Sequence, residues 1–334
     1  MSKIKTVKEK ILRAPVEPRK EGFLPLLLCT VSMAIALLAV IIDKFIYRFG
    51  GELLAPMLSQ LIILLIPAYM FTLIILPEGS TASKLRSLGI SRLRAEYVFF
   101  MIFTALFMIS TSLVMNIIFG GVYTASEGFT LLGAFTAGVG EYTVSYPYLI
   151  IVYAAIPAIV EEIVFRGLLY TTLSKVSEGV AVCLSSIISA AFTFSIGGFP
   201  AALFCSLTYC FVRHTTRSLQ SCMIVHFIFN LYAIFAQTNL SKYFLSSQNL
   251  VLLIIVVVAA LLVSAALFFS ETARVYRGFA KKIKEGEETS GLSAPDFKKL
   301  LEDGRSVLLY RPTLICTIVF LTSFVAITVI RLLS

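Results

Sequence analysis

The chain has 334 residues, of which 58% are hydrophobic and only 14% are charged. Soluble globular proteins carry roughly 45–50% apolar and about 25% charged residues, so this composition excludes an ordinary soluble domain. The formal net charge of +9 would suit a nucleic-acid partner, but the placement of the basic residues argues against that function.

Nine apolar segments account for the hydrophobic excess. Most of them reach about 18–20 residues, the length that crosses a bilayer as a helix. We therefore predict an all-α protein, a polytopic transmembrane helical bundle with about eight to nine membrane spans. The Gly- and Pro-containing joint at 196–200 predicts a hairpin turn between the fifth segment and the short sixth one. In chain order the segments are 23–42, 53–77, 98–119, 147–171, 179–197, 199–212, 218–236, 251–269 and 313–333.

The first apolar segment follows a basic stretch at 1–22, an arrangement that superficially resembles a secretory signal peptide. The apolar run is longer than the roughly 7–15 residues typical of a signal peptide, and no small-residue cleavage site follows it. We therefore expect residues 23–42 to be a retained first span.

Basic residues alternate between the connections in a way that predicts the orientation of the protein. With the N-terminal segment in the cytoplasm, the connections after the second, sixth and eighth segments are also cytoplasmic and hold most of the Lys and Arg. The opposite side holds only Lys44, Arg48 and Lys242, in agreement with the positive-inside rule. We expect a multi-pass protein of the cell membrane with a cytoplasmic N-terminus, whose basic charge contacts membrane lipids and not nucleic acid.

Two of the cytoplasmic stretches, 83–94 and 271–285, combine basic with apolar residues. The second stretch is predicted to be a charged extension of the eighth segment. Each could lie on the membrane surface as an interfacial helix or form a solvated basic loop, and the sequence leaves both alternatives open. The polar stretch at 285–295 predicts a flexible connection.

Ionisable side chains within apolar segments are informative, because each is costly in a bilayer unless it is paired or hydrated. The fourth segment contains Glu161, Glu162 and Arg166, with Pro157 one turn earlier. Glu162 and Arg166 are four residues apart, share a helix face and are predicted to form an ion pair. Glu161 lies about 100° around the helix and has no partner in its own segment, so we expect it to carry the chemistry. The alternative is that the pair is structural and Glu161 only lines a polar seam.

The seventh segment adds His226 and Asn230, which are four residues apart and share one face. A single buried histidine is usually a hydrogen-bonded core residue, but a buried amide one turn away favours a functional pair. Glu161 facing these two residues would form a hydrolytic site, in which the carboxylate activates water and the imidazole and amide hold the oxyanion. The only other histidine, His214, lies in a basic stretch at 213–217 that predicts a surface loop.

These residues resemble motifs of the CPBP family (CAAX proteases and bacteriocin-processing enzymes, also called Abi proteins), which are intramembrane endopeptidases. The first motif of the family, Glu-Glu-x-x-x-Arg, is matched from Glu161 to Arg166, and the third, His-x-x-x-Asn or Asp, from His226 to Asn230. The resemblance covers about a quarter of the chain, 148–232. It implies a catalytic core at 147–238. N-terminal spans at 23–146 and C-terminal spans at 239–334 would flank this core, and a basic cytoplasmic segment lies at 271–312.

The second motif of the family, Phe-x-x-x-His, lacks its histidine in this chain. Framed on Phe192 the histidine position holds Ile196, and framed on Phe194 it holds Gly198. In the family this histidine is thought to help the first glutamate activate water, or to bind a metal. Glu161 would therefore act alone here, or with Ser195 positioning the water.

The resemblance also implies zinc, since members of the family are commonly described as metalloproteases. A catalytic zinc site normally has three protein ligands, usually including two or three histidines, so the ligand set is incomplete in this chain. Glu161 and His226 are the candidate ligands if a metal binds, and the sequence assigns no cofactor.

We predict an intramembrane endopeptidase of the CPBP type that hydrolyses peptide bonds of membrane-associated peptides or proteins with water activated by Glu161. Glu162 and Arg166 would hold the helix in register, and His226 and Asn230 would stabilise the oxyanion. Two alternatives stay open. One is a catalytically impaired pseudoprotease that acts as a membrane binding, immunity or regulatory protein, and the other is a transporter that uses Glu161 as a proton or cation site.

Overall fold

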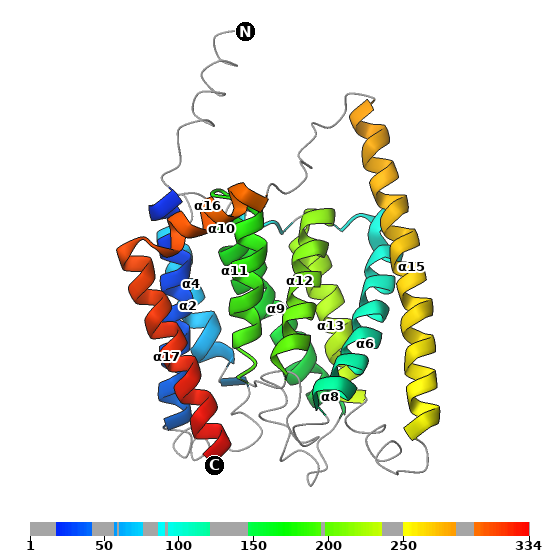
Figure 1. Cartoon of the computed structure of the whole chain (residues 1–334), viewed down its shortest axis with the longest axis horizontal. Helices are drawn as coiled ribbons and strands as arrows, with labels where there is room; N and C mark the ends of the chain where they lie inside the picture. Colours follow the sequence, from blue (N-terminus) through cyan, green and yellow to red (C-terminus); the bar gives the residue numbers. More distant parts are fainter. Residues whose placement is uncertain are drawn as a thin grey trace.

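The computed structural model describes residues 18–41, 57–58, 60–75, 86–90, 93–120, 146–194, 198–235, 250–284 and 297–333. These residues form helices and short turns, and no strand occurs among them. The all-α prediction is therefore confirmed for the described part of the chain. Figure 1 shows most helices running side by side along one direction, with α16 (Phe297–Leu308) lying across one end of the bundle.

Each apolar segment predicted from the sequence contains a helix where the structure describes it, although residues 192–194 at the end of the fifth segment and residue 218 at the start of the seventh are not helical. Three elements (η1, η3 and η4) are π-helical and one (η2) is a short 3-10 helix; the others are α-helices. In chain order they are α2 (Pro18–Ile41), η1 (Gln60–Leu65), α4 (Ile66–Ile75), η2 (Ala95–Tyr97), α6 (Val98–Gly120), α8 (Tyr146–Leu149), η3 (Ile150–Ala155), α9 (Ile156–Glu162), η4 (Ile163–Leu169), α10 (Tyr170–Leu173), α11 (Glu178–Ala191), α12 (Phe199–Thr216), α13 (Leu219–Phe235), α15 (Leu250–Lys284), α16 and α17 (Arg311–Leu333).

Helix α12 is longer than its apolar residues predict. It continues past the expected end at 212 to Thr216 and ends where Arg217 adopts a left-handed conformation, with φ 53°. The prediction that His214 lies in a loop is therefore wrong, because Arg213 and His214 form the last helical turn. Cationic side chains interact favourably with the free carbonyls at a helix C-terminus. Arg213 also donates a hydrogen bond to the Leu88 carbonyl, at 3.3 Å, which ties this turn to the stretch before α6.

The prediction that residues 271–285 extend the eighth segment is confirmed as far as residue 284, and only residues 86–90, 93 and 94 of the other basic stretch, 83–94, are described. Residues 271–284 continue α15 as one helix of 35 residues, about 52 Å long, which exceeds the bilayer hydrocarbon thickness of about 30 Å. Figure 1 shows this end of α15 projecting beyond the neighbouring helices. In the other stretch Leu88 is buried, and the Gly89 carbonyl accepts a hydrogen bond from the amide of Leu219 at the start of α13. Residues 285–295, predicted to be flexible, lie outside the described residues.

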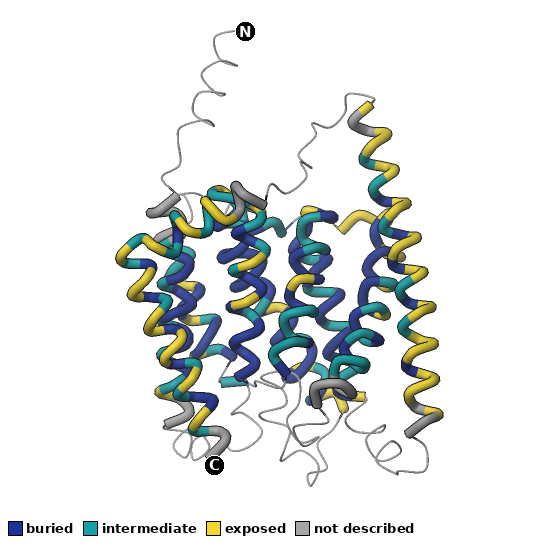
Figure 2. Tube along the Cα trace, viewed as in Figure 1, coloured by how far each residue is buried: buried dark blue, intermediate teal, exposed yellow. Residues whose placement is uncertain are grey.

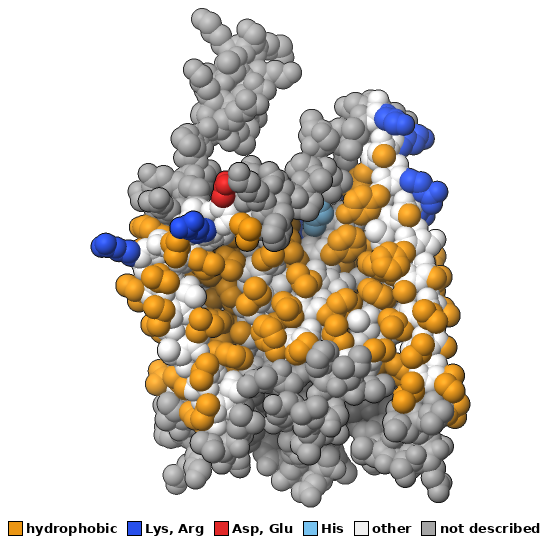
Figure 3. Space-filling view, viewed as in Figure 1, with side chains coloured by type: hydrophobic (Ala, Val, Ile, Leu, Met, Phe, Trp, Pro, Cys, Tyr) orange, Lys and Arg blue, Asp and Glu red, His pale blue; other side chains and the backbone are white. Residues whose placement is uncertain are grey.

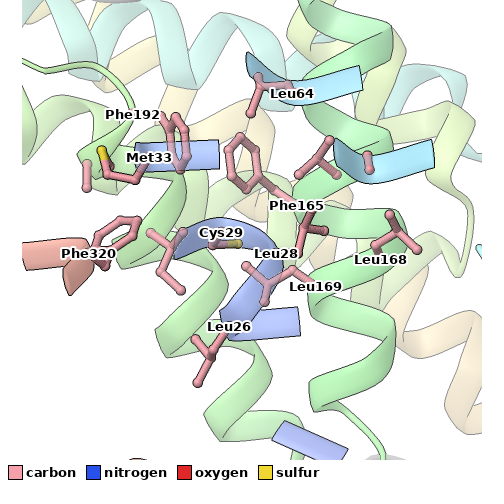
Figure 4. Close-up of a cluster of buried hydrophobic side chains, with 14 of the residues drawn as sticks. Leu26, Leu28, Cys29, Met33, Leu64, Phe165, Leu168, Leu169, Phe192 and Phe320 are labelled. Atoms are coloured by element: carbon pink, nitrogen blue, oxygen red, sulfur yellow. The ribbon is translucent and has the colours of Figure 1, made fainter. Parts of the chain in front are cut away.

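The two larger of three buried apolar clusters in the described residues join most of the helices. The first brings side chains of α2, η4, α11 and α17 into one core around Leu28, Phe165 and Phe192 (Figure 4). The second joins α6, α12, α13 and α15 around Phe100 and Phe268. Figure 2 shows the contrast between the buried inner helices and the outer helices α15 and α17, which carry long exposed faces.

The exposed faces of the outer helices are apolar, which suits contact with lipid. Among the described residues, four helices are long and apolar enough to cross a membrane: Ala95–Met115, Tyr146–Leu173, Ile254–Lys281 and Arg311–Ile330. Figure 3 shows hydrophobic side chains in a band across the bundle, with Lys and Arg at one end of it. These features fit a membrane protein. The count of eight to nine spans, the cell membrane and the cytoplasmic N-terminus stay predictions.

Candidate active site

The helix that carries the two predicted glutamates is interrupted by π-helical turns. One π-helical stretch, η3, ends directly before Ile156 and Pro157, and a second, η4, begins directly after Glu162. Proline removes a backbone donor and its ring clashes with the preceding turn, which favours a wider turn at that point. Single π-helical turns inside α-helices occur frequently at functional sites. The short α-helix α9 therefore presents both glutamates between two irregular turns.

Glu162 and Arg166 form the ion pair that their spacing predicts. Arg166 Nη1 lies 3.1 Å from Glu162 Oε1, and the two side chains are 1% and 0% exposed. Removing one partner of a pair this deeply buried leaves an uncompensated charge, which is strongly destabilising. The pair is therefore a fixed element of the protein interior.

Arg166 is also bound by polar groups that the sequence did not identify. Its Nη2 donates to Ser206 Oγ at 2.5 Å and to the Ser206 carbonyl at 3.0 Å, and Nη1 donates to Ser189 Oγ at 3.3 Å. The Tyr209 ring lies 5.0 Å from the guanidinium carbon. These contacts connect η4 to α11 and α12. Small hydroxyl residues in apolar helices are the only sequence signal for them, and that signal names no partner.

The structure brings His226 between the two carboxylates. Its Nδ1 lies 2.9 Å from Glu162 Oε1, and its Nε2 lies 4.0 Å from Glu161 Oε2. The imidazole also stacks on the Tyr209 ring, with 4.7 Å between centroids and 20° between planes. Besides the predicted pairing with Arg166, the same Glu162 oxygen therefore also contacts the histidine, a contact that spacing within one helix does not predict.

Glu161 has its polar partners on other helices. Gln60 Nε2 donates a hydrogen bond to Glu161 Oε1 at 3.3 Å, across a separation of 101 residues. The Glu161 side chain is 17% exposed, whereas Glu162 is fully buried. The more accessible carboxylate is thus the one that lacks an arginine partner. Sequence analysis missed Gln60, whose only signal is a single amide in an otherwise apolar stretch.

Asn230 lies one turn beyond His226 on α13 and is also buried. Its Oδ1 accepts no hydrogen bond from the described residues, and the same holds for Gln60 Oε1 and Glu162 Oε2. Buried acceptors in proteins are normally hydrogen-bonded to protein or to ordered water. Two of these oxygens belong to Gln60 and Glu162, which contact Glu161 and His226, so this region is suited to hold water or a polar ligand.

The second-motif region is only partly described. Phe192 caps the C-terminus of α11, and Phe194 follows with a positive φ of 52°, so the chain turns sharply where the motif would continue as a helix. Ser195 and Ile196, the positions considered for a catalytic helper, lie outside the described residues, as does residue 197 of the hairpin predicted at 196–200. When the motif is aligned on Phe194, its histidine position is Gly198, which lies in the turn before α12.

The residues of the cluster do not fit a zinc site. Glu161 and His226 are the two candidate ligands, and their nearest atoms are 4.0 Å apart. Glu162 is engaged by Arg166 and by the histidine. The described residues contain no group of three or more His, Cys, Asp or Glu arranged to hold a metal ion. A catalytic zinc normally needs three protein ligands, so no step of the chemistry below uses a metal.

The second histidine of the chain lies apart from this cluster. His214 Nδ1 lies 2.5 Å from Glu178 Oε1, and the side chains are 24% and 50% exposed. The Tyr170 hydroxyl donates to the same carboxylate oxygen, at 3.4 Å. This pair joins the ends of α11 and α12 and takes no part in the candidate site.

The cluster contains the groups that hydrolysis by activated water requires. Glu161 offers a carboxylate with access to the site, and His226 and Asn230 offer nitrogen groups one helical turn apart. Glu162, Arg166 and Tyr209 hold the imidazole from the other side. A base and nearby oxyanion donors on rigid helices are the arrangement used to attack a carbonyl carbon with water.

Comparison with known families gives one match. Residues 143–232 match the family model described as "Type II CAAX prenyl endopeptidase Rce1-like". No curated protein and no solved structure matches the chain. The matched segment contains all five residues predicted for the site, whereas Gln60 lies outside it.

Proposed function

Residues 143–232 belong to the CAAX-protease (CPBP) family, and from this premise we propose that the protein is an intramembrane endopeptidase. The reaction is hydrolysis of a peptide bond in a membrane-associated peptide or protein. The observation that carries the proposal is the His226 ring held between a fully buried, arginine-paired glutamate and the more accessible Glu161.

Glu161 is the general base of the proposed reaction. Its carboxylate takes a proton from water, and the resulting hydroxide forms a bond to the carbonyl carbon of the peptide. The oxygen of the tetrahedral intermediate is held by N–H groups of His226 and Asn230. When the intermediate collapses, the C–N bond breaks and the proton on Glu161 passes to the leaving amine. The carboxylate is then ready for another turnover.

Glu162 and Arg166 position the histidine in this mechanism. The Glu162 carboxylate is paired with Arg166 and also contacts His226 Nδ1, at 2.9 Å, and this contact directs the Nε2 side of the ring toward Glu161. Stacking on Tyr209 restricts rotation of the ring.

We propose the domain organisation and topology that the sequence predicts. The core at 147–238 lies between spans at 23–146 and at 239–334, in the cell membrane, with the N-terminus and the basic segment 271–312 in the cytoplasm. Support comes from the basic side chains at one end of the apolar band (Figure 3). Protease digestion of an N-terminal tag in intact cells tests the orientation, and cleavage of the tag from outside would contradict it.

The test of the function uses the full chain in lipid vesicles with a panel of membrane-tethered peptides, with products identified by mass spectrometry. The wild-type protein should release a product, and Glu161→Gln should reduce the rate by about 10²–10⁴-fold. Glu178→Gln is the matched control, because it makes the same chemical change in a half-exposed glutamate outside the site. Equal product from wild type and Glu161→Gln would contradict the proposal.

One observation favours a second candidate function. The second-motif histidine is absent, so the chain lacks a group that the family uses to activate water. The second candidate is therefore a catalytically impaired pseudoprotease that binds a membrane peptide or partner in an immunity or regulatory role. In that case wild type and Glu161→Gln both retain peptide on the vesicles, and neither forms product.

A further inference from the structure

A buried glutamine from outside the matched segment contacts the proposed base. Gln60 is the first residue of η1 and its only polar side chain, in the sequence Gln-Leu-Ile-Ile-Leu-Leu. η1 packs against α9, the helix that carries Glu161. The Gln60 side chain is buried, and its Nε2 donates to Glu161 Oε1 at 3.3 Å.

We infer that Gln60 is a positioning residue for Glu161 and provides a donor in a site that lacks the second-motif histidine. This inference rests on the proposed function. By binding Oε1, Gln60 fixes the rotation of the carboxylate and leaves Oε2, which lies 4.0 Å from His226 Nε2, to accept the proton of water. The chain has no histidine before His214, so no imidazole other than that of His226 is available to this carboxylate.

The orientation of the amide supports a positioning role. Gln60 Oε1 is buried and accepts no hydrogen bond from the described residues. A glutamine that served only packing would be expected to satisfy both ends of its amide, because an unpaired buried acceptor reduces stability. The reverse orientation would place Oε1 against the carboxylate oxygen, so the amide must direct its donor to Glu161. The Gln60 amide therefore donates to Glu161 although its own oxygen accepts no hydrogen bond from the described residues.

Three variants of the full chain in vesicles test the inference, with the peptide that the wild-type protein cleaves. Gln60→Met keeps the length of the side chain but removes the donor. Gln60→His restores an N–H at the same number of bonds from Cβ. Gln220→Met is the matched control, since it makes the same change in a half-buried glutamine on α13, away from both glutamates.

We expect Gln60→Met to lower kcat by about 10–100-fold, the usual range for a partner that orients a functional group, with KM within about twofold of wild type. Gln60→His should recover most of kcat, and Gln220→Met should leave kcat unchanged. The thermal midpoint of each variant, measured in the same vesicles, identifies misfolding. A kcat for Gln60→Met equal to wild type would overturn the inference. So would equal losses of kcat and of thermal midpoint in Gln60→Met and Gln60→His, because both results would assign Gln60 a structural role.

The outcome separates this inference from the proposed function. If wild type cleaves, Glu161→Gln does not, and Gln60→Met cleaves at the wild-type rate, only the role of Gln60 fails. If wild type and Glu161→Gln behave alike, the proposed function fails, and the role of Gln60 fails with it.

Discussion

The chain has two histidines, and each contacts a glutamate, but the two pairs lie in different surroundings. His226 Nδ1 is 2.9 Å from Glu162 Oε1, with side chains 5% and 0% exposed. His214 Nδ1 is 2.5 Å from Glu178 Oε1, with side chains 24% and 50% exposed. Contact distance alone would rank the exposed pair first. The inner pair differs by its burial, by a paired arginine and by a second carboxylate beside the ring.

Burial changes what each pair contributes to the protein. An exposed ion pair contributes about 0.2–1 kcal/mol to stability, because solvent screens it and the side chains lose entropy. Removing one partner of a buried pair costs about 3–5 kcal/mol, since a charge is left without compensation. The same residue types therefore form a surface contact at the ends of α11 and α12 and a buried pair in the candidate site in the interior.

Loss of Arg166 should have the largest effect on the inner pair. We expect Arg166→Met to lower the free energy of unfolding by about 3–5 kcal/mol, because Glu162 would remain buried without a cation. Chemical unfolding in detergent micelles measures this loss. Arg277→Met, in an exposed arginine on α15, is the control and should cost less than about 0.5 kcal/mol. Similar losses in the two variants would show that Arg166 is not a compensating charge.

Loss of His226 should affect catalysis more than folding. We expect His226→Gln to lower kcat by about 10²–10³-fold, which is the usual cost of removing one oxyanion donor. The glutamine amide cannot contact Glu162 and Glu161 with the geometry of the imidazole, whose two nitrogens face one carboxylate each. Steady-state kinetics in vesicles on the wild-type substrate measures the change. A wild-type kcat in this variant would remove the histidine from the mechanism.

Loss of His214 should have the smallest effect of the three. We expect His214→Gln to leave kcat within about twofold of wild type and to cost about 0.2–1 kcal/mol of stability, because its partner Glu178 is half exposed. The same kinetic and unfolding measurements apply. A loss of activity comparable to that of His226→Gln would abolish the distinction between the two pairs.

The local part of this site could be predicted from the sequence. Helical periodicity places Glu162 next to Arg166 and His226 next to Asn230, and the apolar segments give the helices that carry them. These predictions depend only on spacing within one helix. They succeeded because residues four apart lie near each other on a helix surface, and the Glu162–Arg166 contact is kept even though Arg166 lies in the π-helical η4.

The contacts between helices could not be predicted in the same way. Gln60 reaches Glu161 across 101 residues, and Ser206 reaches Arg166 across 40, so both depend on how helices pack and not on local spacing. The amphipathic helix α16 was missed because its apolar residues are too few to form a span. The end of α12 was misplaced because Arg213 and His214 are polar, while their tertiary partners stabilise a helical turn.

The central claim is that Glu161, held among Gln60, His226 and Glu162, activates water for peptide hydrolysis. The most direct test compares product release by wild type, Glu161→Gln and Glu178→Gln in the same vesicles, with the unfolding midpoint of each variant recorded. We predict that only Glu161→Gln loses product, by about 10²–10⁴-fold, while all three proteins stay folded. Product release by a folded Glu161→Gln variant at the wild-type rate would contradict the account.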